Sequence, residues 1–300
     1  MSTSPSGNFV YGGQAVLEGV MIRGRQVVAV AARSPEGNIK TTTFPIAEWL
    51  TGKYRRIPLL RGTLILLESL IIGMKALTFS AQVSVGDEEN EEPISALSLA
   101  LTLATSLLLA IVLFFMLPLL ITTFTVDHMT DSSIISNVTE GIIRLLIFLG
   151  YLAAITLMPT IRRVFAYHAA EHMTVHAHEA NLDLKVENIR LFPAAHPRCG
   201  TAFLLTVMIV SVIVFAFFGT PDLVLRIISR IVLIPVIAGI AYEVIRFNAR
   251  YSSKWYVKIL AEPSLLMQRL TTRQPDDEQI EVAIAAMNTA LIGDQQAARS

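Results

Sequence analysis

Long apolar segments without charged residues constrain this chain more than any other feature. Residues 94–125 carry no charged side chain, and a helix of that length can cross the roughly 30 Å hydrocarbon core of a bilayer. Residues 138–161, 203–219 and 227–247 form three further apolar segments. Hydrophobic residues make up 53% of the chain and the mean hydropathy is +0.57, which is too apolar for a soluble globular protein. We therefore predict a mainly α-helical membrane protein with about four transmembrane helices.

The charges between these segments predict an orientation. Residues 126–140 and 220–225 contain no Lys or Arg, whereas the connection 162–202 between the second and third spans is rich in basic residues. The positive-inside rule then places this connection and both termini in the cytosol. Arg226 and Arg230 lie near the opposite end of the fourth span and do not fit this assignment. The start of the chain lacks the features of a cleavable signal peptide, and a net charge of zero argues against a nucleic-acid partner.

The N-terminal region predicts a small β structure. Residues 1–13 are expected to be a disordered leader, and residues 14–56 a small cytosolic β element. Within it, residues 27–32 favour a strand, residues 34–38 a tight turn, and residues 39–44 the returning strand. Glu18 and Arg23 are candidates for function, but a solvated strand face is the commoner explanation for such polar residues.

Residues 57–80 and 248–300 read as amphipathic. Arg61, Glu68 and Lys75 are spaced seven apart and so lie on one stripe of a helix. Because an unpaired charged stripe is costly in a bilayer, residues 57–80 are predicted to be an interfacial or re-entrant helix. Residues 248–300 are predicted to form interfacial and cytosolic helices, the last of them over residues 278–291.

A histidine-rich segment is the strongest chemical signal. Residues 167–178 read YHAAEHMTVHAH, so His168 and His172 stand one helical turn apart. With Glu171 they form an HxxEH pattern, in which two histidines bind zinc and the glutamate acts as general base on a water. We expect Zn²⁺ or another divalent metal here. A structural or pH-responsive histidine cluster is the competing interpretation.

A catalytic zinc normally needs a third protein ligand. We consider Glu243 first, because the fourth span returns the chain to the same membrane face, although Arg246 can pair with it instead. Cys199, the single cysteine, and His196 follow in the HPRCG turn at residues 196–200. For these two the alternative is a tight turn that buries the cysteine.

Five separated motifs resemble one known family. They are QAVLEGVMIRG, IPLLRGTLILLESLIIGMKAL, YHAAEH, HPRCGTAF and LMQRLTTRQPDDEQIEVA, between residues 14 and 287. Together they resemble the YqhQ-like family of bacterial membrane proteins, a domain of unknown function often labelled a predicted metal-dependent enzyme. The resemblance implies a multi-pass protein of the bacterial inner membrane. It also implies that polar positions matter at Gln14, Glu18, Arg23, His168, Glu171, His172, His196, Arg198 and Cys199.

Two functional hypotheses follow. The first is a zinc-dependent hydrolase with its site at the cytosolic face of the membrane. The second is a non-enzymatic scaffold or biogenesis factor that binds a membrane-protein partner through the β element and the C-terminal helix. A transporter is less expected, because the first and third spans carry no ionisable residue. No motif specifies a substrate or an oligomeric state.

Overall fold

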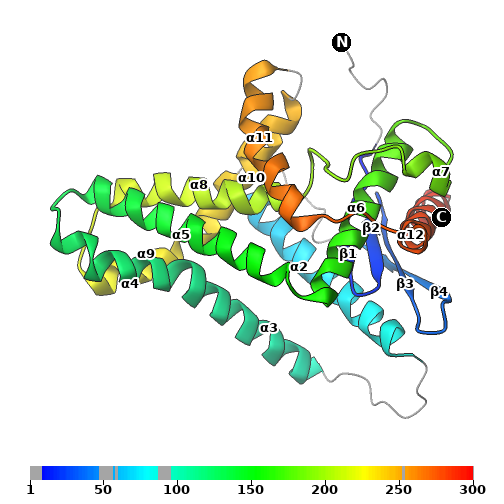
Figure 1. The fold of residues 1–300 in the computed structure, drawn as a ribbon, viewed down its shortest axis with the longest axis horizontal. Coiled ribbons are helices and arrows are strands. Elements are labelled where there is room, and N and C mark those ends of the chain that lie inside the picture. Colours follow the sequence, from blue (N-terminus) through cyan, green and yellow to red (C-terminus); the bar gives the residue numbers. More distant parts are fainter. Residues whose placement is uncertain (1–8, 47–56, 58–59, 87–95, 252–253, 300) are drawn as a thin grey trace.

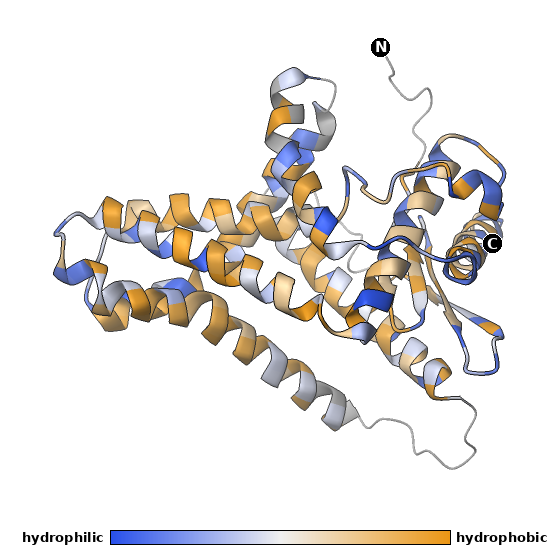
Figure 2. Cartoon of the chain, viewed as in Figure 1, coloured by the Kyte–Doolittle hydropathy of each residue, from blue (hydrophilic) through white to orange (hydrophobic). Residues whose placement is uncertain are grey.

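The chain folds into a helical bundle joined to a small sheet. The computed structural model describes residues 9–46, 57, 60–86, 96–251 and 254–299. Figure 1 shows the helices extending to one side of the sheet, while two helices distant in sequence, α6 and α12, lie beside the sheet. Figure 2 shows that apolar residues dominate the bundle, whereas hydrophilic residues are concentrated around the sheet. The structure is therefore mainly helical with one small sheet, as predicted.

The sheet is an antiparallel meander. Its strands are β1 (Gly12–Val16), β2 (Gly19–Arg23), β3 (Val27–Arg33) and β4 (Ile39–Pro45), in that spatial order. The predicted β3–β4 hairpin is present, and Gly37 in its turn has a φ of +88°, which residues with a Cβ rarely adopt. β1 begins at Gly12, inside the segment predicted as a leader. Residues 1–8 and 47–56 of the two predicted segments lie outside the described residues.

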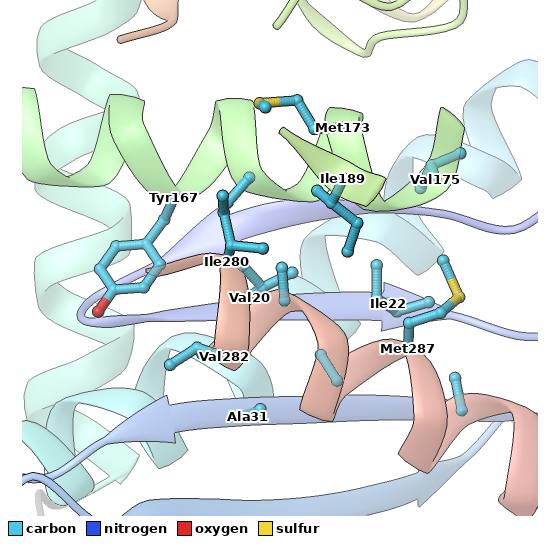
Figure 3. Close-up of a cluster of buried hydrophobic side chains, with 14 of the residues drawn as sticks. Val20, Ile22, Ala31, Tyr167, Met173, Val175, Ile189, Ile280, Val282 and Met287 are labelled. Carbon is cyan, nitrogen blue, oxygen red and sulfur yellow. The ribbon is translucent and has the colours of Figure 1, made fainter. Parts of the chain in front are cut away.

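Both faces of the sheet are covered, which corrects the expectation of a solvated strand face. One face packs against α6 (Pro159–Glu179) and α12 (Asp277–Ala297), as Figure 3 shows, and the other packs against α2 (Leu60–Val85). The residues on the first face include Val20, Ile22, Ala29 and Ala31, and those on the second include Met21, Val28 and Val30. Burial on both sides explains why β3 is apolar at successive positions instead of alternating.

The bundle contains the predicted apolar segments with shifted ends. They form α3 (Ala96–Ile111), the π-helix η2 (Val112–Met116), α4 (Leu117–Phe124), the short 3-10 helix η3 (Val126–His128), α5 (Ser133–Ile155), α8 (Thr201–Phe218), α9 (Leu223–Val232) and α10 (Ile234–Arg250). Among the described residues, Arg61–Val85, Leu101–His128 and Ser133–Ile155 are long and apolar enough to cross a membrane. The pair α9 and α10, bent by 46°, makes a fourth candidate if it counts as one span. Pro235 at the start of α10 accounts for the break.

α2 is the helix predicted to be interfacial, and two of its three charged side chains, Arg61 and Glu68, have partners, while Lys75 is exposed. Arg61 pairs with Glu243 of α10, and Glu68 pairs with Arg23 of β2 at 3.0 Å. Gly62 allows the close approach of α10, since a Cβ there would lie 2.8 Å from the Cβ of Tyr242. Paired charges cost less in a bilayer than the isolated charges assumed from the sequence. The length and composition of α2 fit a membrane span, and its interfacial placement stays a prediction.

The C-terminal helices connect the two parts of the molecule. α11 (Trp255–Thr271) contacts α8, and the short α7 (Val186–Ile189) and α12 lie near the sheet. α12 begins with a capping box, in which the side chains of Asp276 and Gln279 each accept a hydrogen bond from the other's backbone N–H. One face of α12 is buried in the core through Ile280, Ala283 and Met287. The helix predicted over residues 278–291 is thus an integral part of the sheet's core.

Asp294 near the end of α12 holds the β2–β3 turn. Its carboxylate accepts hydrogen bonds from the backbone N–H groups of Arg25, Gln26 and Val27, at 2.7 to 3.2 Å, and from the hydroxyl of Tyr11 at 2.8 Å. Burial alone would raise the pKa of Asp294, but these donors outweigh burial and lower it. One carboxylate therefore ties the C-terminal helix to the β2–β3 turn and to the residue before β1.

We expect Asp294→Asn to lower the stability of the protein. An amide can replace only part of the acceptor capacity, and because the carboxylate is partly exposed we expect a loss of about 1 kcal/mol. The folded-state pKa is lowered, so this contribution is present above the ordinary Asp pKa of about 3.9 and is lost as the pH falls through the folded value. The check is the melting temperature of detergent-purified protein at pH 7 and near pH 3. The exposed Glu278→Gln serves as control, and an equal melting temperature for Asp294→Asn and wild type at pH 7 would contradict the assignment.

Candidate metal centre

The two faces of α6 lie against different parts of the molecule. Tyr167, Ala170 and Met173 lie in the core against the sheet and α12. His168 and His172 face the segment that leads into α8, with ring centroids 4.3 Å apart. Pro159 at the first turn of α6 suits a helix start, because proline has no N–H to leave unpaired there. The packing of the apolar face thus fixes the direction in which the two imidazoles point.

Cys199 of the HPRCG turn completes a set of three possible metal ligands. Its Sγ lies 3.2 Å from Nε2 of His168, and one ligand atom from each of His168, His172 and Cys199 lies within 4.8 Å of the other two. His172 and Cys199 are buried, with 3% and 8% of their surface exposed. Two imidazoles and one thiol at this separation are a typical ligand set for zinc.

Hydrogen bonds at the far side of each ring determine the tautomers. Nδ1 of His168 lies 2.8 Å from the carbonyl oxygen of Thr271, and Nδ1 of His172 lies 2.6 Å from that of Ala194. A carbonyl only accepts, so both Nδ1 atoms carry the proton and both Nε2 atoms present a lone pair. Such backbone acceptors behind histidine ligands are a regular feature of metal sites.

Thr201, the first residue of α8, holds the sulfur of Cys199. Its backbone N–H donates to Sγ at 3.4 Å, and its hydroxyl lies 3.1 Å from Sγ. These two contacts hold the sulfur beside the two imidazoles. The sequence order HPRCGT therefore places the thiol where α8 begins.

Glu171 is buried between β1 and the histidines. One of its carboxylate oxygens lies 3.6 Å from Nε2 of His172, and the backbone N–H of Gly13 donates to the carboxylate. Burial raises the pKa of Glu171 above its usual range, and nearby His168 and His196 oppose this only in part. Burial also lowers the pKa of His172, which favours the neutral, metal-binding ring. Glu171 lies beside the three ligand atoms without being one of them.

His176, Glu179 and His196 form a second close group whose chemistry suits a metal less well. Nδ1 of His196 accepts a hydrogen bond from the backbone N–H of Arg198, so Nε2 carries the proton. That Nε2, 3.7 Å from Glu179, then has no lone pair to offer a metal. Glu179 is also paired with Arg198. The two candidates His196 and Arg198 therefore lie next to the three-ligand group and complete its surroundings.

Gln268 of α11 fixes the HPRCG turn from outside. The side chain is fully buried; its Oε1 accepts from the N–H of His196 at 2.8 Å, and its Nε2 donates to the carbonyl of His196 at 3.0 Å. Sequence reasoning missed both Gln268 and the carbonyl of Thr271. This region was predicted as part of an interfacial helix and as a family motif, and nothing in its spacing indicates contact with a turn far earlier in the chain.

The other predicted site residues lie elsewhere. Glu243 is not among the three close ligand atoms, because α10 packs against α2 and the carboxylate pairs with Arg61. Gln14 packs against Gly73 of α2, and Arg23 pairs with Glu68.

Glu18 has its own role in positioning α6. Its carboxylate accepts from Arg163 at 2.7 and 2.5 Å and from the hydroxyl of Tyr167 at 3.3 Å. The hydrogen bonds from Arg163 outweigh burial and lower the pKa of Glu18. Glu18 has a φ of +47°, an uncommon conformation for a residue other than glycine. The β1–β2 turn is thus bound to the first half of the histidine helix, in place of the solvated surface expected from the sequence.

Comparison with known proteins gives a family without an activity. A family model described as a protein of unknown function, DUF1385, matches residues 57–292. A protein of Bacillus subtilis (strain 168) described as uncharacterized protein YqhQ is 35% identical over 295 residues, covering 94% of this chain and 92% of that relative. No solved structure matches.

Replacing Gln268 by Leu should loosen the HPRCG turn. The change leaves the buried N–H of His196 without a partner, and such an unsatisfied group costs about 1–3 kcal/mol. The C=O of His196 loses one of its two donors and keeps the N–H of Cys199. We expect a melting temperature several degrees below that of wild type in detergent. Gln274→Leu, at an exposed position beyond α11, is the matched control. A Gln268→Leu protein as stable as this control would show that the turn does not depend on Gln268.

Proposed function

Because this chain belongs to the DUF1385 family, whose function is unknown, we propose its function from its own site: it is a membrane protein that binds one zinc ion through His168, His172 and Cys199 and hydrolyses a substrate there. The family descriptions neither support nor oppose this chemistry. The proposal rests on the arrangement of side chains in the described part of the chain.

The single observation that carries the proposal is that Nε2 of His168 and Nε2 of His172 each present a lone pair close to the sulfur of Cys199. Both Nε2 atoms are acceptors, because both Nδ1 atoms face backbone carbonyls. A thiol has one proton, so Cys199 can donate to only one of the two rings at a time. A divalent ion would satisfy both nitrogens and the thiolate together. The residues present therefore fit zinc better than they fit a closed hydrogen-bond network.

Three protein ligands leave a fourth position, which distinguishes catalytic from structural zinc sites. Zinc, when bound, acts as a Lewis acid and makes a water more acidic. Glu171, buried beside His172, is placed to take a proton from a water and to return it to a leaving group. The N–H of Gly13 holds one oxygen of this carboxylate in position.

The surroundings suggest where the reaction occurs. The ligands lie where α6, the start of α8 and the end of α11 meet, between the sheet and the apolar bundle. With the basic connection 162–202 in the cytosol, this is the inner face of a bacterial cytoplasmic membrane. A substrate that meets the site there is a peptide bond near the membrane or a lipid head group.

The alternative of a scaffold loses part of its basis in this structure. The β element and the C-terminal helix were its proposed docking surfaces, and α12, α6 and the sheet bury their apolar faces against one another. A pH-responsive histidine cluster remains the competing use of the same side chains. Metal content separates these alternatives.

We expect near-stoichiometric zinc in wild-type protein purified without a histidine tag. His168→Ala/His172→Ala should lose nearly all of it, because a single thiolate binds zinc weakly, and Cys199→Ser should retain much less than wild type. Mass spectrometry of the metal content per chain is the measurement. His128→Ala, an exposed histidine at the other end of the bundle, is the control. Equal trace amounts in wild type and double variant would exclude the metal site.

We expect Glu171→Gln to keep the zinc and to lose hydrolysis. The amide preserves size but cannot accept the proton, and removing a general base typically costs about 10²–10⁴-fold in rate. The assay compares wild type and variant on fluorogenic peptides and on lipid head-group esters in mixed micelles. Zinc retention with undiminished hydrolysis would remove Glu171 from the mechanism. Zinc retention without hydrolysis by wild type on any probe would favour a structural metal.

A further inference from the structure

A second polar centre lies inside the bundle, independent of the proposed zinc site. Glu140 of α5 is 1% exposed and contacts three arginines: Arg144 at 2.6 Å, Arg226 at 3.1 Å and Arg230 at 2.8 Å. Each arginine is at most 2% exposed. Ionised groups buried in a membrane bundle are costly and generally mark a function.

The neighbouring backbone and an aromatic ring contact the buried arginines. The π-helix η2 lies opposite Arg144, whose Nε donates to the carbonyl of Phe114 at 2.9 Å. The ring of Phe215 lies 5.3 Å from the guanidinium of Arg144 and 4.1 Å from that of Arg230. π-helical turns inside α-helices are frequent at functional sites. Local helix geometry and aromatic contacts thus both support the arginines.

Arg226 connects this cluster to a cavity at the end of the bundle far from the sheet, where α4, α5 and α9 meet (Figure 1). The cavity has a volume of about 250 Å³. Its lining is rich in hydroxyl groups and consists of Thr123, Asp127, Thr130, Asp131, Ser132, Ser136, Thr220, Pro221, Leu223 and Arg226. Its size admits a small polar group and excludes a drug-sized ligand.

Inside the bundle, the arginines near the cavity outnumber the carboxylates that pair with them. Arg226 also pairs with Asp127 at 2.5 Å, so three guanidinium groups share two carboxylates and one positive charge is left over. Asp131 lines the cavity but is exposed, so water screens its charge. The other oxygen of Asp127 accepts from Ser136. Nε of Arg226 is buried without a hydrogen-bond partner among the described residues.

We propose that this cavity binds one singly charged phosphate group, supplied by the phosphodiester of an anionic lipid. A phosphate oxygen would complete the hydrogen bonds of Arg226 and balance the excess positive charge, and the hydroxyl groups would donate to the remaining oxygens. Phe124, Leu223 and Val224 are exposed apolar residues at the same end, where acyl chains would cover them. The shared chemistry also admits free inorganic phosphate, which the experiment separates from the lipid.

The test uses full-length protein in detergent and measures the melting temperature with added phosphatidylglycerol, phosphatidylcholine or inorganic phosphate. We expect phosphatidylglycerol to raise the melting temperature by several degrees and zwitterionic phosphatidylcholine to have little effect. Thr220→Leu fills the cavity at an exposed position without touching the charge cluster and should remove the shift. Thr125→Leu, exposed at the same end and outside the cavity lining, should keep it.

A second readout does not depend on variants. In nanodiscs of phosphatidylglycerol compared with phosphatidylcholine, hydrogen exchange should slow in residues 123–136 and 220–226.

A shift of the melting temperature with inorganic phosphate that Thr220→Leu abolishes would support the anion site and assign it to free phosphate. An equal lipid shift in Thr220→Leu and Thr125→Leu, or no shift and no protection with either anion, would overturn the proposal.

Discussion

The packing of α6 against the sheet is the constraint on which the candidate site depends. Tyr167, Ala170 and Met173 fill the core on one side of the helix, so the opposite side can only face the HPRCG turn. The turn in turn is held by Gln268 and by the start of α8. A helix with only a mixed polar and apolar sequence thereby becomes a rigid support for two imidazoles. Close packing of this kind limits how far either ring can move.

The sequence predicted local features well where one physical signal dominates. Uncharged apolar segments identified the bundle helices, and the turn at residues 34–38 identified the β3–β4 hairpin. The spacing of His168 and His172 placed both rings on one face of α6. These features depend on residues close together in the chain, so periodicity and turn chemistry suffice to find them.

Features that depend on distant contacts were less accessible. Glu243 was favoured as a ligand from its expected depth in the membrane, but α2 brings Arg61 to it, and the position of α2 does not follow from its own sequence. The apolar run of β3 was compatible with one covered face or two, and only α2 on the second face decides this. Arg226 and Arg230 do not fit the charge rule, yet both lie on a helix and pair with Glu140 inside the bundle. The positive-inside rule counts charged residues in loops and does not consider ion pairs within the bundle.

The order of the elements along the chain has a consequence for biogenesis. The strands β1 to β4 are synthesised first, but the helices that cover them come from residues 60–85, 159–179 and 277–297. The four strands therefore leave the ribosome well before α12 is synthesised. The bundle helices are synthesised between the two. Contacts of such large sequence separation form late and slowly. One face of the sheet therefore stays partly uncovered until the last helix has left the ribosome. Until then its apolar surface is open to chaperones or to the membrane itself.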